Sequence, residues 1–286
     1  MLLAGIPVAV FGQLLELVGL PPQGSADVRE TVGTVFTIAM LLVGTWIMLA
    51  RVDHRPWQWV GLGRAAAEPR RIVVGFLIGG GAIALAIGAL IVVGWLRLES
   101  VLGVVAGHPM LRLTALLIPA ALMEELVTRG YILTALREAM GWPAAIAVTS
   151  VGFGLLHLKN PGADLQSLTL VMLAGVFLAV VRVATDSLYA TWSAHFSWNW
   201  VMGVLFHAPI SGRAFSFPSY RYVDAGPDWA TGGVWGPEGG FVAGVAMIGA
   251  VIVLLRMGTG NRELGTVSSE PPVPSSQIPV PHETNE

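Results

Sequence analysis

The stretch Ala121-Leu122-Met123-Glu124-Glu125-Leu126-Val127-Thr128-Arg129 places two adjacent carboxylates and a guanidinium inside an apolar run from Leu111 to about Leu136. A transmembrane helix needs roughly 20 apolar residues, so the run is long enough to cross a bilayer. Each charge at the centre of such a helix costs about 2.5–3.5 kcal/mol, and intramembrane charges therefore face a protein interior or a wet cavity. The stretch predicts a functional site at membrane depth.

Helical geometry separates the two acids of this stretch. Glu125 and Arg129 are four residues apart with the acid on the N-terminal side, so they share a face and can form an ion pair. Glu124 lies about 100° further round the helix, outside that pair. We therefore expect Glu125 and Arg129 to have a supporting role, and Glu124 to remain available for chemistry. The alternative for Glu125 and Arg129 is an ion pair that only holds helices together.

The composition of the whole chain agrees with a membrane protein. The 286 residues are 54% hydrophobic and only 12% charged, with a mean hydropathy of +0.70. Soluble domains have about 25% charged residues, so the lipid bilayer is the expected partner. The net charge of −2 argues against a nucleic-acid partner. The absence of cysteine excludes disulfides, Cys-ligated metals and thiol nucleophiles. The arginine bias among the basic residues is typical of a GC-rich bacterial source.

Apolar segments of spanning or near-spanning length recur along the chain. They fall at about 2–20, 33–50, 72–95, 111–136, 142–158, 167–184, 188–207 and 239–256. The expected fold class is therefore all-α, a polytopic transmembrane bundle of about eight spans over residues 1–256. Residues 257–286 are rich in Ser, Pro, Glu and Thr, and we expect a disordered tail there. Gly75 and Gly79 form a GxxxG pattern, which predicts close helix packing.

Basic residues predict how the bundle is oriented in the membrane. The densest cluster follows the second apolar segment and contains Arg51, Arg55, Arg64, Arg70 and Arg71. The positive-inside rule places this loop in the cytoplasm, which makes both termini cytoplasmic as well. The segment 208–238 then becomes a loop on the opposite face. Its Trp229 and Trp235 are expected at the level of the lipid headgroups, and the alternative is that this loop forms a lid over a cavity.

Two later apolar segments bring further polar groups to membrane depth. Phe153 and His157 are four residues apart, and His195 and Asn199 share one face of a later helix. A carboxylate in an apolar site can act as a general base towards water. Imidazoles can bind a metal or form hydrogen bonds, and an Asn amide can stabilise an oxyanion. The set favours amide hydrolysis, while the absence of HExxH and GxSxG disfavours the common zinc proteases and serine hydrolases.

Four motifs follow one another along the chain. They are Glu124-Glu125-x-x-x-Arg129, Phe153-x-x-x-His157, Gly175 followed by Thr185-Asp186-Ser187-Leu188, and His195-x-x-x-Asn199. In this order they resemble the motifs of the CAAX-prenyl-protease-like intramembrane proteases, known as the CPBP or Rce1/ABI family. The resemblance covers a core of about 111–212. His157-Leu158-Lys159-Asn160-Pro161 and Pro209-Ile210-Ser211-Gly212 within it resemble the bacterial branch of the family.

This resemblance implies an intramembrane active site that acts on a peptide or protein substrate. Glu124 would activate the water, His157 and His195 would complete the site, and Asn199 would help stabilise the oxyanion. Glu125 and Arg129 would support them. Family members have been described both as metalloproteases and as glutamate-dependent proteases. The cofactor is therefore open, because Glu124, His157 and His195 could bind zinc or could polarise water without a metal.

Two rival functions use the same residues differently. In a transporter, Glu124, His157 and His195 would form a proton or ion relay. The sequence shows no internal repeat and no matched pair of interrupted helices, which disfavours that interpretation. In a membrane scaffold or immunity factor without proteolytic activity, the fold would only bind partners. A scaffold has no reason to keep Glu124 beside an already paired Glu125, so the sequence favours the protease, embedded in a bacterial cytoplasmic membrane.

Overall fold

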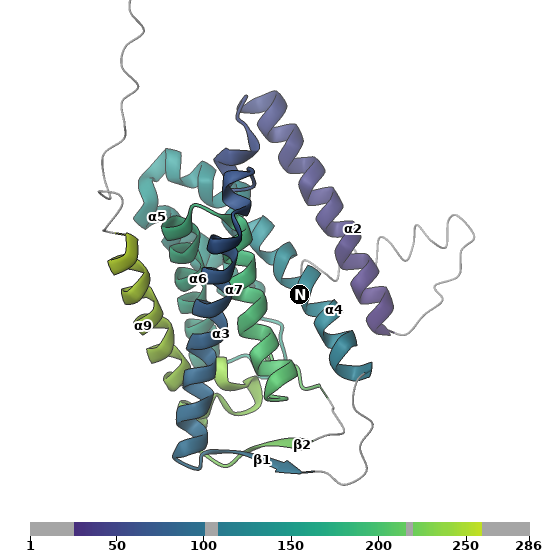
Figure 1. The fold of residues 1–286 in the computed structure, drawn as a ribbon, viewed down its shortest axis with the longest axis vertical. Coiled ribbons are helices and arrows are strands. Elements are labelled where there is room, and N and C mark those ends of the chain that lie inside the picture. Colours follow the sequence, from purple (N-terminus) through teal and green to yellow (C-terminus); the bar gives the residue numbers. More distant parts are fainter. Residues whose placement is uncertain (1–25, 101–107, 216–219, 259–286) are drawn as a thin grey trace, which may run out of the picture.

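The computed structural model describes residues 26–100, 108–215 and 220–258, and helices that run roughly along its long axis form most of it (Figure 1). The helices of the bundle are α2 (Ala26–Ile47), α3 (Pro69–Val92), α4 (His108–Glu125), α5 (Ile132–Leu156), α6 (Leu165–Thr185), α7 (Leu188–Trp200) and α9 (Phe241–Gly258). The remaining regular elements are the short helix α8 (Asp228–Thr231) and the strands β1 (Leu96–Ser100) and β2 (Tyr220–Asp224).

Shorter helical turns connect or extend these elements. Three are π-helical, at Met48–Val52, Leu126–Tyr131 and Val201–Leu205. Four are 3₁₀ turns, at Trp57–Val60, Ala65–Ala67, Gly233–Trp235 and Pro237–Gly239. The two strands form an antiparallel ribbon across one end of the bundle, with Leu96 opposite Asp224 and Ser100 opposite Tyr220 (Figure 1). The prediction of an all-α polytopic membrane protein is confirmed.

Four helical stretches of the described residues are long and apolar enough to cross a membrane. They are Val32–Val52, Pro69–Val92, Pro109–Leu156 and Leu165–Thr185. The third combines the expected segments 111–136 and 142–158, because helical turns continue on both sides of Gly141, where the chain bends with a φ of +78°.

By length and hydropathy, the described residues therefore contain fewer spans than the eight or so expected. The expected segment 188–207 is helical, but its polar side chains, His195 and Asn199 among them, lower its hydropathy. The segment 239–256 forms the shorter apolar helix Phe241–Met257. The first expected segment, 2–20, and the tail from 259 onward lie outside the described residues.

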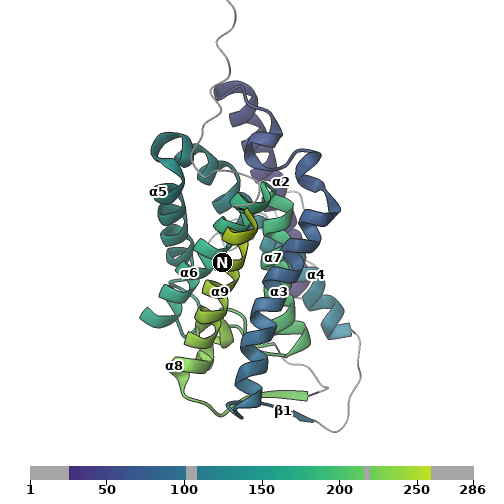
Figure 2. The ribbon, with the colours of Figure 1, turned by 60° about the vertical axis from the view of Figure 1, so that its left-hand side comes forward.

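The main apolar core lies where α3, α6, α7 and α9 meet. Buried side chains such as Ile83, Ile87, Val181 and Met247 belong to it. Figure 2 shows α9 running alongside α3 and α6, and α9 contacts both of these helices. This core surrounds α7, the helix that carries His195.

Gly75 and Gly79 bring α3 and α7 into backbone contact, which confirms the predicted close packing. A β-carbon added at Gly75 would collide with the carbonyl of Ala190, and one added at Gly79 would collide with that of Ala194. Only glycine allows two helices to approach so closely. Because Ala194 directly precedes His195, this contact fixes where His195 lies in the bundle.

The first turn of α7 is also held in place by hydrogen bonds. The Ser187 hydroxyl accepts a hydrogen bond from the Ala190 N–H, which is the usual contact of a helix N-cap. The same hydroxyl donates to the Ala66 carbonyl at 2.5 Å, and Ser187 is fully buried. The start of α7 is thereby fixed to the loop that precedes α3.

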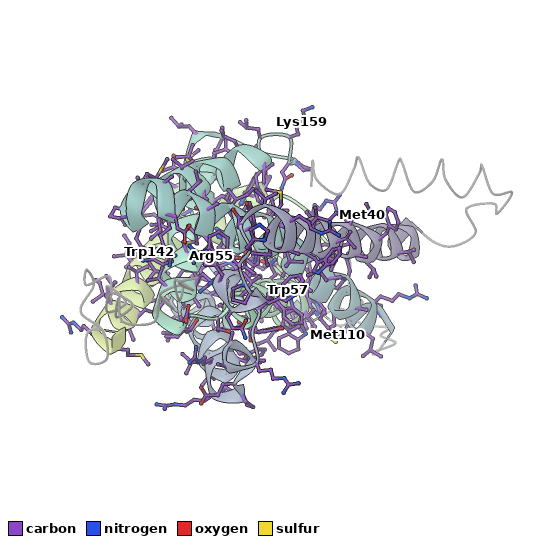
Figure 3. The ribbon with its side chains drawn as sticks, turned by 90° about the horizontal axis from the view of Figure 1, so that it is seen from above. Met40, Arg55, Trp57, Met110, Trp142 and Lys159 are labelled. Atoms are coloured by element: carbon purple, nitrogen blue, oxygen red, sulfur yellow. The ribbon has the colours of Figure 1, made fainter. Side chains whose placement is uncertain are left out.

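The basic loop after α2 packs onto the helix that follows Arg129. The Tyr131 hydroxyl donates to Asp53 at 2.7 Å, and the Trp59 indole donates to Glu138 at 2.8 Å. Seen from above, Arg55 lies over the middle of the bundle, whereas Lys159 points outward at its edge (Figure 3). The predicted orientation of this loop in a membrane stays a prediction.

The two tryptophans expected at the headgroups behave differently. Trp229 is 55% exposed, as a surface aromatic would be. Trp235 is only 1% exposed and packs in a small core with Phe153 and Val171, so the prediction was wrong for Trp235. The glycine-rich backbone around it, including Gly232 and Gly236 at positive φ, turns tightly enough to carry the indole inward.

Replacing Gly79 by alanine should destabilise the protein. The added methyl group would force α3 and α7 apart, and such overpacking costs about 1–3 kcal/mol. The matched control is Gly81→Ala in the same helix, where the added carbon meets no described atom outside its helix within 4 Å. We expect a lower midpoint of thermal unfolding in detergent for Gly79→Ala only. Equal midpoints for the two variants would contradict the packing role.

Candidate active site

Glu125 lies at the centre of a buried network of charged and polar groups. Its side chain is fully buried, and Oε1 accepts a hydrogen bond from Arg129 Nη1 at 3.1 Å. The same oxygen accepts a second hydrogen bond from His195 Nδ1 at 2.7 Å. The first contact is the ion pair that the helical spacing predicts. The second joins α4 to α7 and was not predicted.

Arg129 extends this network to two further helices. Its Nη2 donates to the Gly175 carbonyl of α6 at 3.1 Å, and its Nη1 also donates to the Thr128 hydroxyl at 2.7 Å. The guanidinium carbon lies 4.2 Å from the centroid of the Phe153 ring in α5, within cation–π range. Gly175 permits this arrangement, because a β-carbon there would lie 2.8 Å from the Ser150 Cα.

The chain leaves α-helical geometry directly after the two acids. Residues Leu126–Tyr131 form a π-helical turn, in which Gly130 has a non-helical φ of −80° and ψ of −115°. Such π-bulges within α-helices occur frequently at functional sites. The Thr128 hydroxyl donates to the Glu124 carbonyl at 2.7 Å inside this turn. The turn therefore sets the direction in which the acid pair and Arg129 point.

His195 lies between the two carboxylates. Because Nδ1 is hydrogen-bonded to Glu125, the neutral ring carries its proton on Nδ1, and Nε2 is left facing the other way. Nε2 lies 3.8 Å from Glu124 Oε2. The Glu124 side chain is 17% exposed, in contrast to the fully buried Glu125. Glu124 and His195 therefore both reach a cavity, while Glu125 stays behind them.

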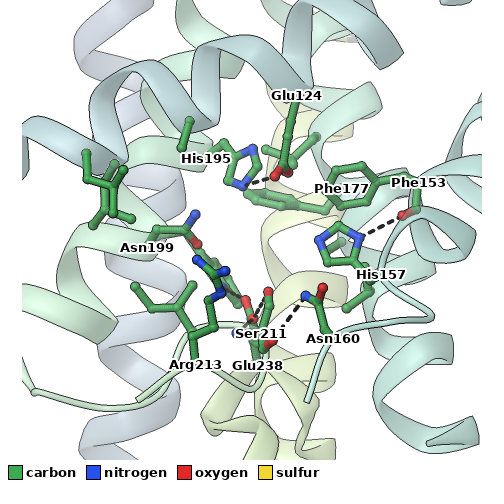
Figure 4. Close-up of a pocket in the computed structure, with 18 of the residues that line it drawn as sticks. Glu124, Phe153, His157, Asn160, Phe177, His195, Asn199, Ser211, Arg213 and Glu238 are labelled. Carbon is green, nitrogen blue, oxygen red and sulfur yellow. Dashed lines mark hydrogen bonds and ion pairs between the residues drawn. The ribbon is translucent and has the colours of Figure 1, made fainter. Parts of the chain in front are cut away.

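His157 reaches the same cavity from the end of α5. Its Nδ1 donates to the Phe153 carbonyl at 2.8 Å, so the other ring nitrogen, Nε2, is directed away from the helix (Figure 4). The Phe153 ring packs against both imidazoles, with centroid distances of 4.8 Å to His157 and 6.0 Å to His195. The spacing of four between Phe153 and His157 therefore allows a direct hydrogen bond from the imidazole to the backbone.

The cavity brings together the four residues predicted to carry the chemistry. Glu124, His157, His195 and Asn199 all line it, and their side chains point into it (Figure 4). Its walls are apolar, with side chains from α4, α5, α6 and α7 such as Leu117, Phe153, Phe177 and Trp198. The structure thus gathers the predicted set around one cavity between the helices.

The opposite side of the cavity is polar and was only partly predicted. It is lined by Asn160, Ser211, Arg213 and Glu238. Asn160 and Ser211 belong to the minor motif features, whereas Arg213 and Glu238 lie in the segment interpreted as a surface loop. Neither stands in a helical pattern with another polar residue, so no spacing in the sequence indicated them.

The arrangement of the donor atoms bears on whether the site can bind a metal ion. Among the described residues, no three His, Asp or Glu side chains are grouped closely enough to hold one. Zinc in proteins takes at least three such ligands, so Glu124, His157 and His195 as placed do not supply a zinc site.

The part of the sequence that carries the predicted site residues resembles a known protein family. A model of the family described as type II CAAX prenyl endopeptidase Rce1-like matches residues 106–201. The matched segment contains every predicted site residue from Glu124 to Asn199, and it confirms the resemblance seen in the motifs. No curated protein and no solved structure matches the chain.

Removing the Arg129 guanidinium should lower the stability of the folded protein. Glu125 would keep only His195 as a donor, and breaking a buried ion pair costs about 3–5 kcal/mol. The matched control is Arg221→Ala, which breaks the exposed pair with Glu99 on the ribbon, where the cost is about 0–1 kcal/mol. We expect the thermal midpoint in detergent to fall clearly for Arg129→Ala and hardly for the control. A stable but inactive Arg129→Ala protein would instead indicate a direct part in the chemistry.

Proposed function

We propose that this chain, which resembles the CAAX-protease family over residues 106–201, cleaves a peptide bond within the membrane by means of a water molecule activated by Glu124. The observation that carries the proposal is the pairing pattern of the two acids. Glu125 is occupied by Arg129 and His195, whereas Glu124 faces the cavity together with both imidazoles. One acid therefore organises the site and the other is available for proton transfer.

The water would be activated from one wall of the cavity. The Glu124 carboxylate is the acceptor for its proton, and a positioned general base contributes about 10²–10⁴-fold to a rate. His157 presents Nε2 to the same space, because its Nδ1 is held by the Phe153 carbonyl. That nitrogen can accept a hydrogen bond from the water and orient it towards the substrate.

His195 and Asn199 would act on the other atoms of the scissile bond. His195 is fixed through Nδ1, so its Nε2 can receive a proton from the Glu124 side and pass it to the leaving amine. The Asn199 amide lies one helical turn further along α7 and can donate to the developing oxyanion. One such donor typically contributes about 2.7–4 kcal/mol to stabilisation of the transition state.

The surroundings define the class of partner. The apolar wall of the cavity favours a substrate segment with apolar side chains, and the helical exterior favours a lipid bilayer. We infer a peptide or protein substrate, no nucleic acid, and an integral membrane location with both termini in the cytoplasm. The bacterial cytoplasmic membrane is the location that the residue usage favours.

Glu124→Gln should abolish cleavage without unfolding the protein. Glutamine keeps the shape of the side chain but cannot take up the proton of water, so we expect the rate to fall by about 10²–10⁴-fold. The assay is release of fluorescence from a library of quenched apolar peptides by purified protein in detergent, with the thermal midpoint measured in parallel. Glu68→Gln is the control, since Glu68 is half-exposed and forms an ion pair with Arg71. Activity within a few-fold of wild type would remove Glu124 from the role of base.

Metal analysis tests whether the water is activated without zinc. Because Glu124, His157 and His195 do not form a three-ligand group, we expect far less than one metal ion per chain by elemental mass spectrometry. The comparison is a His157→Ala/His195→Ala double variant, purified identically. Stoichiometric zinc in the wild type and none in the double variant would overturn this expectation and make Glu124 the partner of a metal-bound water.

A further inference from the structure

A second buried carboxylate lines the cavity and has no part in the proposed chemistry. Glu238 belongs to the 3₁₀ turn Pro237–Gly239 that precedes α9, and it is only 7% exposed. It lies on the polar side of the cavity, across from Glu124 (Figure 4). A buried carboxylate is costly unless hydrogen bonds compensate it, so the groups that hold it indicate what it does.

The two oxygens of Glu238 bind two different parts of the site. Oε2 accepts a hydrogen bond from the Trp198 indole N–H of α7 at 3.2 Å. Oε1 accepts from the Ser211 backbone N–H at 2.7 Å and from the Ser211 hydroxyl at 2.6 Å. Trp198 lies directly before Asn199 and three residues after His195. The carboxylate therefore links the catalytic face of α7 to the segment around Ser211.

That segment is a tight turn which forms the polar floor of the cavity. Ile210 and Arg213 exchange two backbone hydrogen bonds of 2.9 Å around it. Ser211 and Gly212 both have positive φ, +48° and +81°, and Ser211 holds this conformation although it is not glycine. The Asn160 amide donates to the Ser211 carbonyl at 3.1 Å, which ties the turn to the loop that follows His157.

We propose that Glu238 is a positioning residue of the active site, which holds the Ile210–Arg213 floor at a fixed distance from Asn199 and His195 on α7. A carboxylate suits this task because it offers acceptors on both oxygens and donates nothing, and three donors converge on it. A substrate bound in the cavity lies between that floor and α7. The inference rests on the proposed peptidase function, and the residue acts through the binding geometry rather than on the scissile bond.

Two substitutions remove the hydrogen bond between Glu238 and Trp198, one by changing the acceptor and the other by changing the donor. In Glu238→Gln the amide oxygen can still accept both Ser211 hydrogen bonds, but the amide nitrogen opposes the Trp198 N–H. In Trp198→Phe the carboxylate and the Ser211 contacts remain, and the indole N–H donor is lost together with part of the ring that packs in the core. Because both variants remove one and the same hydrogen bond, their effects should not add in the double variant.

The kinetic test uses the best-cleaved member of the quenched apolar peptide library. We expect Glu238→Gln to raise KM by about 10-fold or more, the range for a lost hydrogen bond to a charged group, with kcat changed by less than about threefold. Trp198→Phe should raise KM similarly, and the double variant no further. The control is Glu99→Gln, half-exposed on β1 and paired with Arg221, which should leave both constants unchanged.

Three kinetic outcomes would overturn the proposal. They are an unchanged KM in Glu238→Gln, fully additive effects in the double variant, and a loss of kcat at constant KM, which would give Glu238 a place in the chemistry itself. A lower thermal midpoint with normal KM at a permissive temperature would also count against it, because it would show a purely structural role.

A readout without substrate separates this inference from the proposed function. Hydrogen exchange at the Ser211 amide should accelerate by about 10-fold or more in Glu238→Ala, which removes its acceptor, and not in Glu99→Ala. If the wild-type protein cleaves no peptide but exchange still accelerates in Glu238→Ala, the link is supported and the peptidase function is contradicted. Unchanged exchange in Glu238→Ala would overturn the link whether or not peptides are cleaved.

Discussion

The Glu125 carboxylate, buried without access to water, constrains the arrangement of the helices around it. A buried charge costs several kcal/mol unless it is paired and hydrogen-bonded, and here Arg129 and His195 provide that compensation. Arg129 in turn reaches α6 through the Gly175 carbonyl. Three helices must therefore dock in one register, since any shift of α4, α6 or α7 leaves a buried charge unpaired.

The hydrogen bond that compensates Glu125 also orients the His195 ring. Glu125 occupies the Nδ1 of His195, which directs Nε2 towards Glu124 and the cavity. A network that only stabilised the bundle would not need a second acid beside the first. Glu124 lies between the imidazole of His195, whose orientation is fixed, and the cavity. The ion pair with Arg129 and the orientation of His195 therefore both depend on the Oε1 atom of Glu125.

Helix α7 connects the two sides of the cavity. Its N-terminal half is held against α3 by the contacts at Gly75 and Gly79, and its middle carries His195. Trp198 then ties it to Glu238 and the Ser211 turn. The side of the cavity that carries Glu125 and the polar floor are therefore both held by hydrogen bonds to one helix.

The sequence by itself determined the features that follow from local spacing and from the cost of charge in an apolar setting. The all-α class, the Glu125–Arg129 pair and the close packing at Gly75 and Gly79 are of this kind. So is the expectation that Glu124, His157, His195 and Asn199 face one interior space, because polar groups at membrane depth cannot face lipid.

Tertiary structure alone decided which of these faces meet. The bond from His195 to Glu125 spans 70 residues, and the contacts of Glu238 with Trp198 and Ser211 span 40 and 27. The burial of Trp235, wrongly expected at the surface, is of the same kind. Periodicity fixes the direction of a side chain within its own helix, but its partner is set by the packing of helices that are distant in sequence.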